Sequence, residues 1–236
     1  MPEQRSEFGA VRDLIGRLRE FPVDPARSAL LLIDLQYLDA HDTGEQAQRA
    51  RREGTWDEIA PYFERLRTVA VPASIRLIAA ARATGMPVLF SRCVSFTPEQ
   101  RDNGRRFREF GINVPPDSRD AQILDELGPR PGDLILNKTT ASVFLSTSVD
   151  RTLRQMGVDT LVVGGVVTSG CVESAVRDAC DLDYGVLLVD EACADRTPEL
   201  HEQALKRLHR NFAIVRSVDE AIAAMGTSTP PAGGSA

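Results

Sequence analysis

From residue 29 onward, the sequence alternates short apolar runs with amphipathic stretches, and this alternation restricts the fold more than any other feature. The apolar runs have the length and the Val, Leu and Ile content of buried strands, whereas the stretches between them repeat apolar residues at helical spacing. This rhythm is typical of βα units, which build a mainly parallel sheet with helices on both faces. The sequence therefore predicts an α/β fold, a three-layer α/β/α sandwich around a mainly parallel six-stranded sheet.

The expected strands are Ala29–Leu35, Pro87–Arg92, Asp133–Asn137, Thr160–Gly164, Gly185–Val189 and Phe212–Arg216. The expected helices are Val71–Thr84, Ser146–Met156, Cys171–Leu182, Pro198–Arg210 and Val218–Met225. A further helix is predicted before the first strand, where apolar residues recur at helical spacing: Val11, Leu14, Ile15, Leu18 and Phe21. We expect one domain over residues 1–225, followed by a disordered tail at 226–236 that is rich in Pro and Gly.

Two polar segments, Asp39–Tyr62 and Ser95–Arg119, fit neither pattern. Long connections in an open parallel sheet often cover the ligand crevice at the carboxyl ends of the strands, so both are candidate lids. The second segment carries four arginines that could bind a substrate carboxylate: Arg101, Arg105, Arg106 and Arg108. A solvated helix face, with Glu99 and Glu109 as ionic partners, is an equally good interpretation of these arginines.

Composition excludes several classes of partner. Hydrophobic residues make up 42% of the chain and charged residues 26%, which is typical of a globular protein. The net charge of −6, with Arg and Glu interleaved, argues against a nucleic-acid partner. No apolar run approaches the roughly 20 residues of a membrane span, and the amino terminus lacks the pattern of a secretory signal, so we expect a cytoplasmic protein without a membrane partner. The four cysteines have no metal-binding or disulfide spacing and predict reduced thiols.

Three polar residues end three of the predicted strands: Asp34, Lys138 and Cys171. The carboxyl ends of parallel strands share one edge of the sheet, so we expect the three side chains to converge. Cys171 would open a helix, whose positive end favours the thiolate together with the Lys138 ammonium. Asp34 can then move the protons that a nucleophilic thiol and a leaving amine require. Backbone N–H groups of the turn at 167–171 could hold an oxyanion.

Each of these residues also has an ordinary structural interpretation. An Asp after a strand is often a turn former, a Lys is usually solvated, and a lone Cys is more often a small buried residue than a nucleophile. The combination favours catalysis, since the remaining cysteines have no comparable setting. Cys93 ends a strand, Cys180 lies within a predicted helix, and Cys193 follows two acidic residues.

The region from Ala29 to Val218 resembles the cysteine hydrolases of the isochorismatase-like superfamily. The resemblance rests on the segments LLLIDLQ, KTTASVF and GGVVTSGCVESAVRDACDLDYGVLLVDEACAD. It implies a catalytic triad of Asp34, Lys138 and Cys171, a cis peptide bond between Val166 and Val167, and an oxyanion site formed by the N–H groups of Val167 and Cys171. True isochorismatases lack the cysteine, so its presence implies hydrolysis of a C–N bond in a small amide or ureido substrate.

The TSGC segment resembles the branch of N-carbamoylsarcosine and maleamate amidases, although Glu173 stands where those enzymes often carry Arg. Nicotinamidases of the superfamily commonly bind a metal through one Asp and two His. This sequence offers His41, and its other histidines, His201 and His209, fall on the last long helix, which the resemblance places away from the site. We therefore expect no metal and no cofactor, and the resemblance implies a homo-oligomer, a dimer or tetramer. The open alternatives are a nicotinamidase-type reaction, a thiol redox or acyl-carrier role, and a non-catalytic binding or assembly module.

Overall fold

Six parallel strands form one sheet in the order β3-β2-β1-β4-β5-β6. The structure is a computed structural model that describes residues 17–226. The strands are β1 (Ser28–Ile33), β2 (Val88–Cys93), β3 (Leu134–Lys138), β4 (Thr160–Val166), β5 (Gly185–Ala194) and β6 (Ile214–Arg216). The predicted α/β fold around a parallel six-stranded sheet is confirmed.

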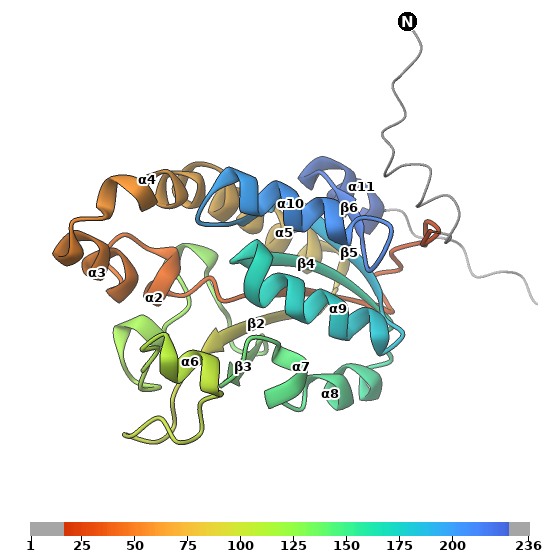
Figure 1. The fold of residues 1–236 in the computed structure, drawn as a ribbon. Helices are drawn as coiled ribbons and strands as arrows, with labels where there is room; N and C mark the ends of the chain where they lie inside the picture. The colour runs from red at the N-terminus through yellow and green to blue at the C-terminus, as the bar shows by residue number, and fades with distance from the viewer. Residues whose placement is uncertain (1–16, 227–236) are drawn as a thin grey trace, which may run out of the picture.

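Helices cover both faces of this sheet, because successive residues of the central strands point to opposite sides. In β1, Leu30 and Leu32 join one apolar cluster, whereas Leu31 and Ile33 join another. The first cluster is covered by α5 (Val71–Thr84) and α11 (Val218–Gly226). The second is covered by α8 (Val149–Gln155), α9 (Glu173–Asp181) and α10 (Pro198–Leu208). All of β1 is buried, which makes it a central strand of a three-layer sandwich (Figure 1).

The two polar segments lie beyond the carboxyl ends of the strands. The first forms α2 (Tyr37–Ala40), α3 (Glu45–Glu53) and α4 (Trp56–Arg65), and α4 continues through a π-helical turn at Leu66–Ala70. The second contains α6 (Arg105–Glu109). Figure 1 shows α2, α3 and α6 grouped beyond the arrowhead of β2. Both segments are therefore placed to cover ligands at this edge of the sheet.

Several boundaries differ from the sequence-based expectation. β1 ends at Ile33 rather than Leu35, since Asp34 adopts a left-handed conformation with φ 56°. The helix expected at Ser146–Met156 is divided into α7 (Val143–Ser146) and α8, because Thr147 is extended. β5 runs on to Ala194 through an irregularity in its pairing with β4. Helical structure after β4 starts at Thr168 with a π-helical turn, Thr168–Val172, so Cys171 does not open the helix.

The predicted amino-terminal helix lies mostly outside the described residues, as does the tail from 227 onward. Leu18 and Phe21 are described, and neither is helical. Phe21 instead packs against Gly185, the first residue of β5.

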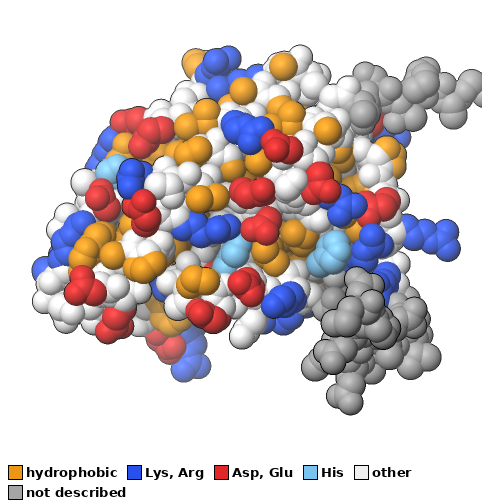
Figure 2. Space-filling view, turned by 90° about the horizontal axis from the view of Figure 1, so that it is seen from above, with side chains coloured by type: hydrophobic (Ala, Val, Ile, Leu, Met, Phe, Trp, Pro, Cys, Tyr) orange, Lys and Arg blue, Asp and Glu red, His pale blue; other side chains and the backbone are white. Residues whose placement is uncertain are grey.

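Between residues 17 and 226, no helix is both long and apolar enough to cross a membrane. Acidic and basic side chains are interspersed over the face that Figure 2 shows.

Candidate functional site

The strand order places the candidate residues at one point of the sheet. β1 and β4 are neighbours, and the chain winds outward from them in opposite directions, which is where open α/β sheets bind ligands. Asp34 directly follows β1, and Cys171 lies in the π-helical turn after β4. Lys138 is the last residue of β3, two strands from β1. The structure brings these three side chains together.

The Lys138 ammonium is the centre of this group. Its Nζ lies 2.8 Å from Asp34 Oδ2 and 3.3 Å from Cys171 Sγ. It also lies 3.2 Å from Cys93 Sγ and donates to the carbonyl oxygen of Thr140 at 3.0 Å. An ammonium has three N–H donors for these four acceptors, so two of the acceptors share one donor.

The electrostatics keep this buried lysine charged. Its side chain is 0% exposed and that of Asp34 is 2% exposed. Burial acts to lower the pKa of Lys138. The negative charge of Asp34 has the opposite effect, to which Cys171 and Cys93 add, and together they outweigh burial, so the pKa lies well above its usual range. The site therefore carries a permanent positive charge beside the Cys171 sulfur.

Cys93 belongs to this site, although it was set aside in the sequence as a strand-end residue. Its register partner on β3 is Lys138, and its Sγ lies 3.4 Å from Asp34 Oδ2. A hydrogen bond with Cys171, followed by burial, raises the pKa of Cys93 well above its usual range, so Cys93 remains a thiol that donates to Asp34. The sequence could have indicated this position, because Cys93 ends the predicted strand that follows the strand of Asp34 and precedes the strand of Lys138.

Hydrogen bonds fix the Asp34 carboxylate and the strand ends around it. Ser91 Oγ donates to Asp34 Oδ1 at 2.9 Å, and Asp34 N–H donates to the Ser91 carbonyl at 3.0 Å. The buried Gln36 side chain accepts from Cys93 N–H at 2.6 Å and donates to the Asp120 carbonyl at 2.8 Å. These bonds tie the end of β1 to β2 and to Asp120, the residue that follows the second insertion.

The turn that carries Cys171 depends on glycines at points of close approach. Gly165 has φ +126°, and a Cβ there would lie 2.1 Å from the Ile33 carbonyl oxygen. A Cβ on Gly170 would lie 2.9 Å from Val167 Cγ2. Any larger residue would push β4 from β1 or open the turn. Close packing therefore explains why glycine occupies positions 165 and 170 in the segment GGVVTSGC.

The backbone of the turn after β4 is held by hydrogen bonds of its own N–H groups. The peptide bond between Val166 and Val167 is cis. Ser169 N–H donates to Asp195 Oδ2 at 2.6 Å, and Gly170 N–H donates to the Val167 carbonyl at 3.0 Å. Val172 N–H also donates to the Val167 carbonyl, at 3.3 Å. These hydrogen bonds fix the turn that carries Cys171.

The expectation that His201 lies away from the site is wrong. Its Nδ1 lies 2.8 Å from the hydroxyl of Thr168, at the start of the turn, because α10 packs against that turn. Its Nε2 lies 2.9 Å from Asp190 Oδ1. Arg65 Nη2 also reaches Asp190, at 3.2 Å. The hydrogen bond from His201 lowers the pKa of Asp190. This network holds the turn without touching Cys171.

Among residues 17–226, one group of three possible metal ligands occurs, Asp34, Cys93 and Cys171, whose ligand atoms lie within 4.8 Å of one another. The Lys138 ammonium already contacts all three of them. A bound cation would displace the ammonium or face strong repulsion from it. His41 pairs with Thr43, and neither it nor the other two histidines joins this group. The donor set fits a fixed ammonium better than a metal ion.

One arginine of the second insertion reaches the Cys171 turn. Arg101 and Arg105 pair with Glu99 and Glu109, and Arg108 binds the carbonyl of Asn103. The Nη2 atom of Arg106 lies 3.6 Å from the position of a Cβ on Gly170, next to Cys171. In the region that the structure describes, Arg106 forms no ion pair with an acid. Glu173, in contrast, is neutralised by Arg177 and Arg207, each at 2.8 Å.

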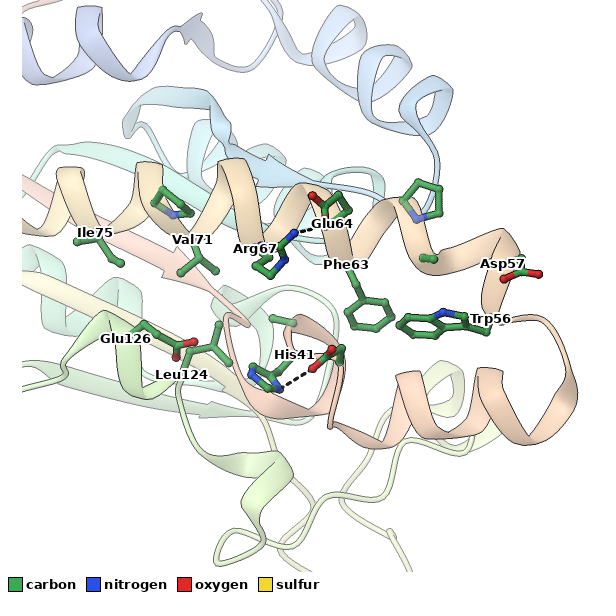
Figure 3. A pocket seen from close by; sticks show the side chains of 15 residues that line it. His41, Trp56, Asp57, Phe63, Glu64, Arg67, Val71, Ile75, Leu124 and Glu126 are labelled. Atoms are coloured by element: carbon green, nitrogen blue, oxygen red, sulfur yellow. Dashed lines mark hydrogen bonds and ion pairs between the residues drawn. The ribbon is translucent and has the colours of Figure 1, made fainter.

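A hollow of the surface is separate from this group. It has a volume of about 680 Å³ and lies between α4 and α5 on one side and His41 and Leu124 on the other (Figure 3). Trp56, Phe63 and Val71 make one of its walls. Its lining contains neither Asp34 nor Lys138 nor Cys171, so it is not the space in which their chemistry takes place.

A carboxyl near the triad makes stability depend on pH. Burial, and then the charge of Asp34, raises the pKa of Asp39 from 3.8 to about 7, against the opposite effect of Arg196 and Lys138. The folded protein holds this proton more tightly than the unfolded chain, so the stabilisation is complete below about pH 3.8 and is lost as the pH rises through about 7. We expect Asp39→Asn, which cannot ionise, to gain up to about 4 kcal/mol over wild type between about pH 4 and about pH 8.

Urea unfolding of both proteins at the two pH values measures this difference. A stability difference that is the same at both pH values would contradict the prediction.

The fold and the site together define the class of protein: an α/β domain with a doubly wound parallel sheet and with an acid, an ammonium and a thiol in contact at its switch point. The Isochorismatase domain model matches residues 28–220, and the chain belongs to this family. It is 30% identical over 239 residues to the ureidoacrylate amidohydrolase RutB of Pantoea ananatis, covering 94% of this chain and 91% of that protein.

Two further proteins are similar to this chain in sequence or in fold. The N-carbamoylsarcosine amidase of an Arthrobacter species is 30% identical over 160 residues, which are 64% of this chain and 60% of that enzyme. A cysteine hydrolase from Pseudomonas syringae pv. phaseolicola has the same fold, with a TM-score of 0.75 at 24% identity over 90% of this chain and 98% of that one.

Proposed function

We propose that the protein is a cysteine amidohydrolase that cleaves a C–N bond, other than a peptide bond, in a small amide or ureido compound. One observation carries the proposal: the Lys138 ammonium contacts both the Asp34 carboxylate and the Cys171 sulfur at the switch point of the sheet. The two curated relatives are named as hydrolases of ureido compounds, which supports the same reaction class here.

In the proposed reaction, Cys171 transfers its proton to Asp34 and its sulfur attacks the substrate carbonyl carbon. The C–N bond then breaks as Asp34 returns the proton to the departing ammonia or amine. This leaves an acyl group on sulfur, a thioester for an amide and a thiocarbamate for a ureido substrate. Asp34 next takes a proton from water, whose oxygen attacks that carbonyl and releases the Cys171 thiol. Lys138 compensates the negative charge that moves between Asp34 and Cys171.

The developing oxyanion would rest on the N–H groups of Val167 and Cys171. The hydrogen bonds that fix this turn support this role, since donors held in place before the reaction stabilise such a charge without reorganisation. The glycines at 165 and 170 and the His201 network hold the turn that presents them.

We further propose that the enzyme works as a homo-oligomer, a dimer or tetramer, in the cytoplasm. All four cysteines are free thiols, which supports a reducing compartment.

A panel of small amides and ureido acids, assayed for ammonia release with and without a chelator, tests the function. We expect turnover that a chelator does not change and that denatured protein lacks. Chelator-sensitive hydrolysis of nicotinamide would favour the nicotinamidase-type reaction. Adducts or disulfides on Cys171 without turnover would favour a redox or carrier role. Inertness of the folded protein across the panel would favour a binding or assembly module.

Arg106 provides a test of carboxylate recognition. Because its guanidinium stands beside Gly170 without an acidic partner, we expect Arg106→Gln to raise KM for acidic substrates roughly 10-fold, with a smaller effect on neutral amides. Arg105→Gln is the matched control. Arg105 is the neighbour of Arg106 in sequence, but its guanidinium pairs with Glu109. Equal effects of both variants on acidic and neutral substrates would exclude a specific role for Arg106.

A further inference from the structure

Two cysteine sulfurs lie close together in the reacting group. Sγ of Cys93 and Sγ of Cys171 lie within 4.8 Å of each other, and the Lys138 ammonium contacts both, at 3.2 Å and 3.3 Å. Cys93 ends β2 and Cys171 lies in the turn after β4, and these two strands flank β1. Both residues are free thiols. The proposed hydrolysis needs only one of these sulfurs as nucleophile, so the second invites a separate explanation.

The two sulfurs differ in how readily an oxidant from solution reacts with them. Cys171 is half-buried, and the ammonium beside it favours the thiolate, which is the form that oxidants attack. Cys93 is only 5% exposed, and a hydrogen bond with Cys171, followed by burial, holds its pKa well above its usual range. An oxidant therefore reacts with Cys171 first, while Cys93 remains a thiol next to it.

The remaining cysteines lie outside this group. Cys180 belongs to α9 and Cys193 to β5, and neither joins the cluster of closely spaced atoms that contains Cys93 and Cys171. Burial raises the pKa of Cys193 to about 12, which keeps it unreactive. Cys180 thus offers a control thiol away from the site.

We propose that Cys93 and Cys171 form an oxidation site, at which a hydroperoxide joins the two sulfurs in a disulfide and switches the hydrolase off. The inference rests on the proposed function, because the loss of activity requires Cys171 to be the nucleophile. A disulfide leaves no thiol at position 171 to attack a carbonyl, and a dithiol that reduces the disulfide restores it.

The first step uses the same proton transfer as the hydrolysis. Cys171 gives its proton to Asp34, and its sulfur attacks one oxygen of the hydroperoxide. The O–O bond breaks, the sulfur becomes a sulfenic acid, and Asp34 returns the proton to the departing alkoxide or hydroxide. The sulfur is oxidised by two electrons, which the hydroperoxide takes up.

The second step joins the sulfurs. The Cys93 thiol gives its proton to Asp34, whose Oδ2 lies 3.4 Å from the sulfur, and the Cys93 sulfur attacks the Cys171 sulfur. The S–O bond breaks, and hydroxide leaves as water with the proton that Asp34 returns. Overall, two thiols and one hydroperoxide give a disulfide, water and an alcohol, or two waters when the oxidant is hydrogen peroxide.

The buried ion pair does not depend on the two thiols. Lys138 has Asp34 Oδ2 at 2.8 Å and the Thr140 carbonyl at 3.0 Å as acceptors besides the sulfurs. Ser91 Oγ donates to the other oxygen of Asp34 at 2.9 Å. Formation of the disulfide therefore leaves no buried charge without a partner, and reduction returns the site to its resting arrangement.

Treatment of wild type with excess hydrogen peroxide, followed by dithiothreitol, tests the inference. We expect the peroxide to reduce ammonia release at least about 10-fold, because position 171 has lost its thiol, and dithiothreitol to restore nearly all of it. Peptide mass mapping without reductant should find the Cys93 peptide joined to the Cys171 peptide, with two hydrogen atoms lost and no oxygen added. This mapping needs neither a variant nor enzymatic activity.

Two variants separate this disulfide from general oxidation. Cys93→Ala is compared with its own untreated rate. Its Cys171 sulfenic acid has no partner thiol and takes up further oxygen to give a sulfinic acid, which dithiothreitol does not reduce, so a loss of at least about 10-fold should remain after the reductant. Cys180→Ala is the matched control and should lose and regain activity as wild type does.

The outcomes separate the two proposals. Wild type that hydrolyses its substrate but carries only oxygen on Cys171 after peroxide, or joins Cys171 to another cysteine, overturns the oxidation site and leaves the proposed function standing. Recovery of Cys93→Ala as complete as that of wild type also overturns it. A disulfide between Cys93 and Cys171 in a protein that hydrolyses nothing in the panel supports the sulfur chemistry, but it overturns the proposed function and with it the switch.

Discussion

Replacing Cys171 by alanine is expected to reduce turnover at least about 10⁴-fold while the protein stays folded. The thiol is the proposed nucleophile, and Asp34 and Lys138 serve the proton and the charge. The neighbouring Cys93 is not expected to take over the attack, because it is buried and its pKa lies well above its usual range. The variant loses one sulfur atom at a half-buried position, so its stability should change little. Ammonia release measures the activity, and urea unfolding measures the stability.

The other cysteines provide the controls. Cys180 lies in α9 without a contact to the triad, and Cys180→Ala should keep the wild-type rate. Cys93→Ala removes a donor to Asp34 and should slow the reaction without stopping it. Mass spectrometry of rapidly quenched wild type should find the acyl group on Cys171. An acyl group on Cys93, or full activity of Cys171→Ala, would refute the assignment of the nucleophile.

Replacing Lys138 by methionine is expected to cost about 3–5 kcal/mol of unfolding free energy and to abolish turnover. The change leaves the Asp34 carboxylate buried with no opposite charge, which is far more costly than the loss of a surface ion pair. It also removes the positive charge beside the Cys171 sulfur.

The double variant Asp34→Asn with Lys138→Met separates the two effects. Removing both charges should recover most of the lost stability, because no uncompensated charge remains. It should not recover turnover, since the proton acceptor and the compensating charge are both absent. Equal instability of single and double variants, measured by urea unfolding at neutral pH, would contradict a buried ion pair between these residues.

Much of the fold was predictable because each βα unit has its own hydrophobic pattern. The boundaries were not, since they depend on contacts between units. β1 looked two residues too long because Leu35 is buried like the strand residues before it, although the chain has already turned at Asp34. The end of β5 was missed because the polar segment Asp190–Glu191 interrupts its apolar run, and its partners lie on other elements.

The candidate site was predictable where a residue ends a strand, because parallel strands share an edge. Asp34, Lys138 and Cys171 met this condition and converge in the structure. Residues that reach the site from elsewhere gave no such signal. His201, which binds the turn before Cys171, lies in the body of a helix.

The strand order also bears on when the protein acquires its chemistry during folding. Residues next to one another in the site come from β1, β3 and β4, so no single continuous segment of the chain contains the group. Such a site forms only after pairings between distant segments, which are slow steps in the folding of parallel sheets. Protection of Cys93 from thiol reagents should therefore appear together with enzymatic activity on refolding, which makes this cysteine a chemical reporter of sheet completion.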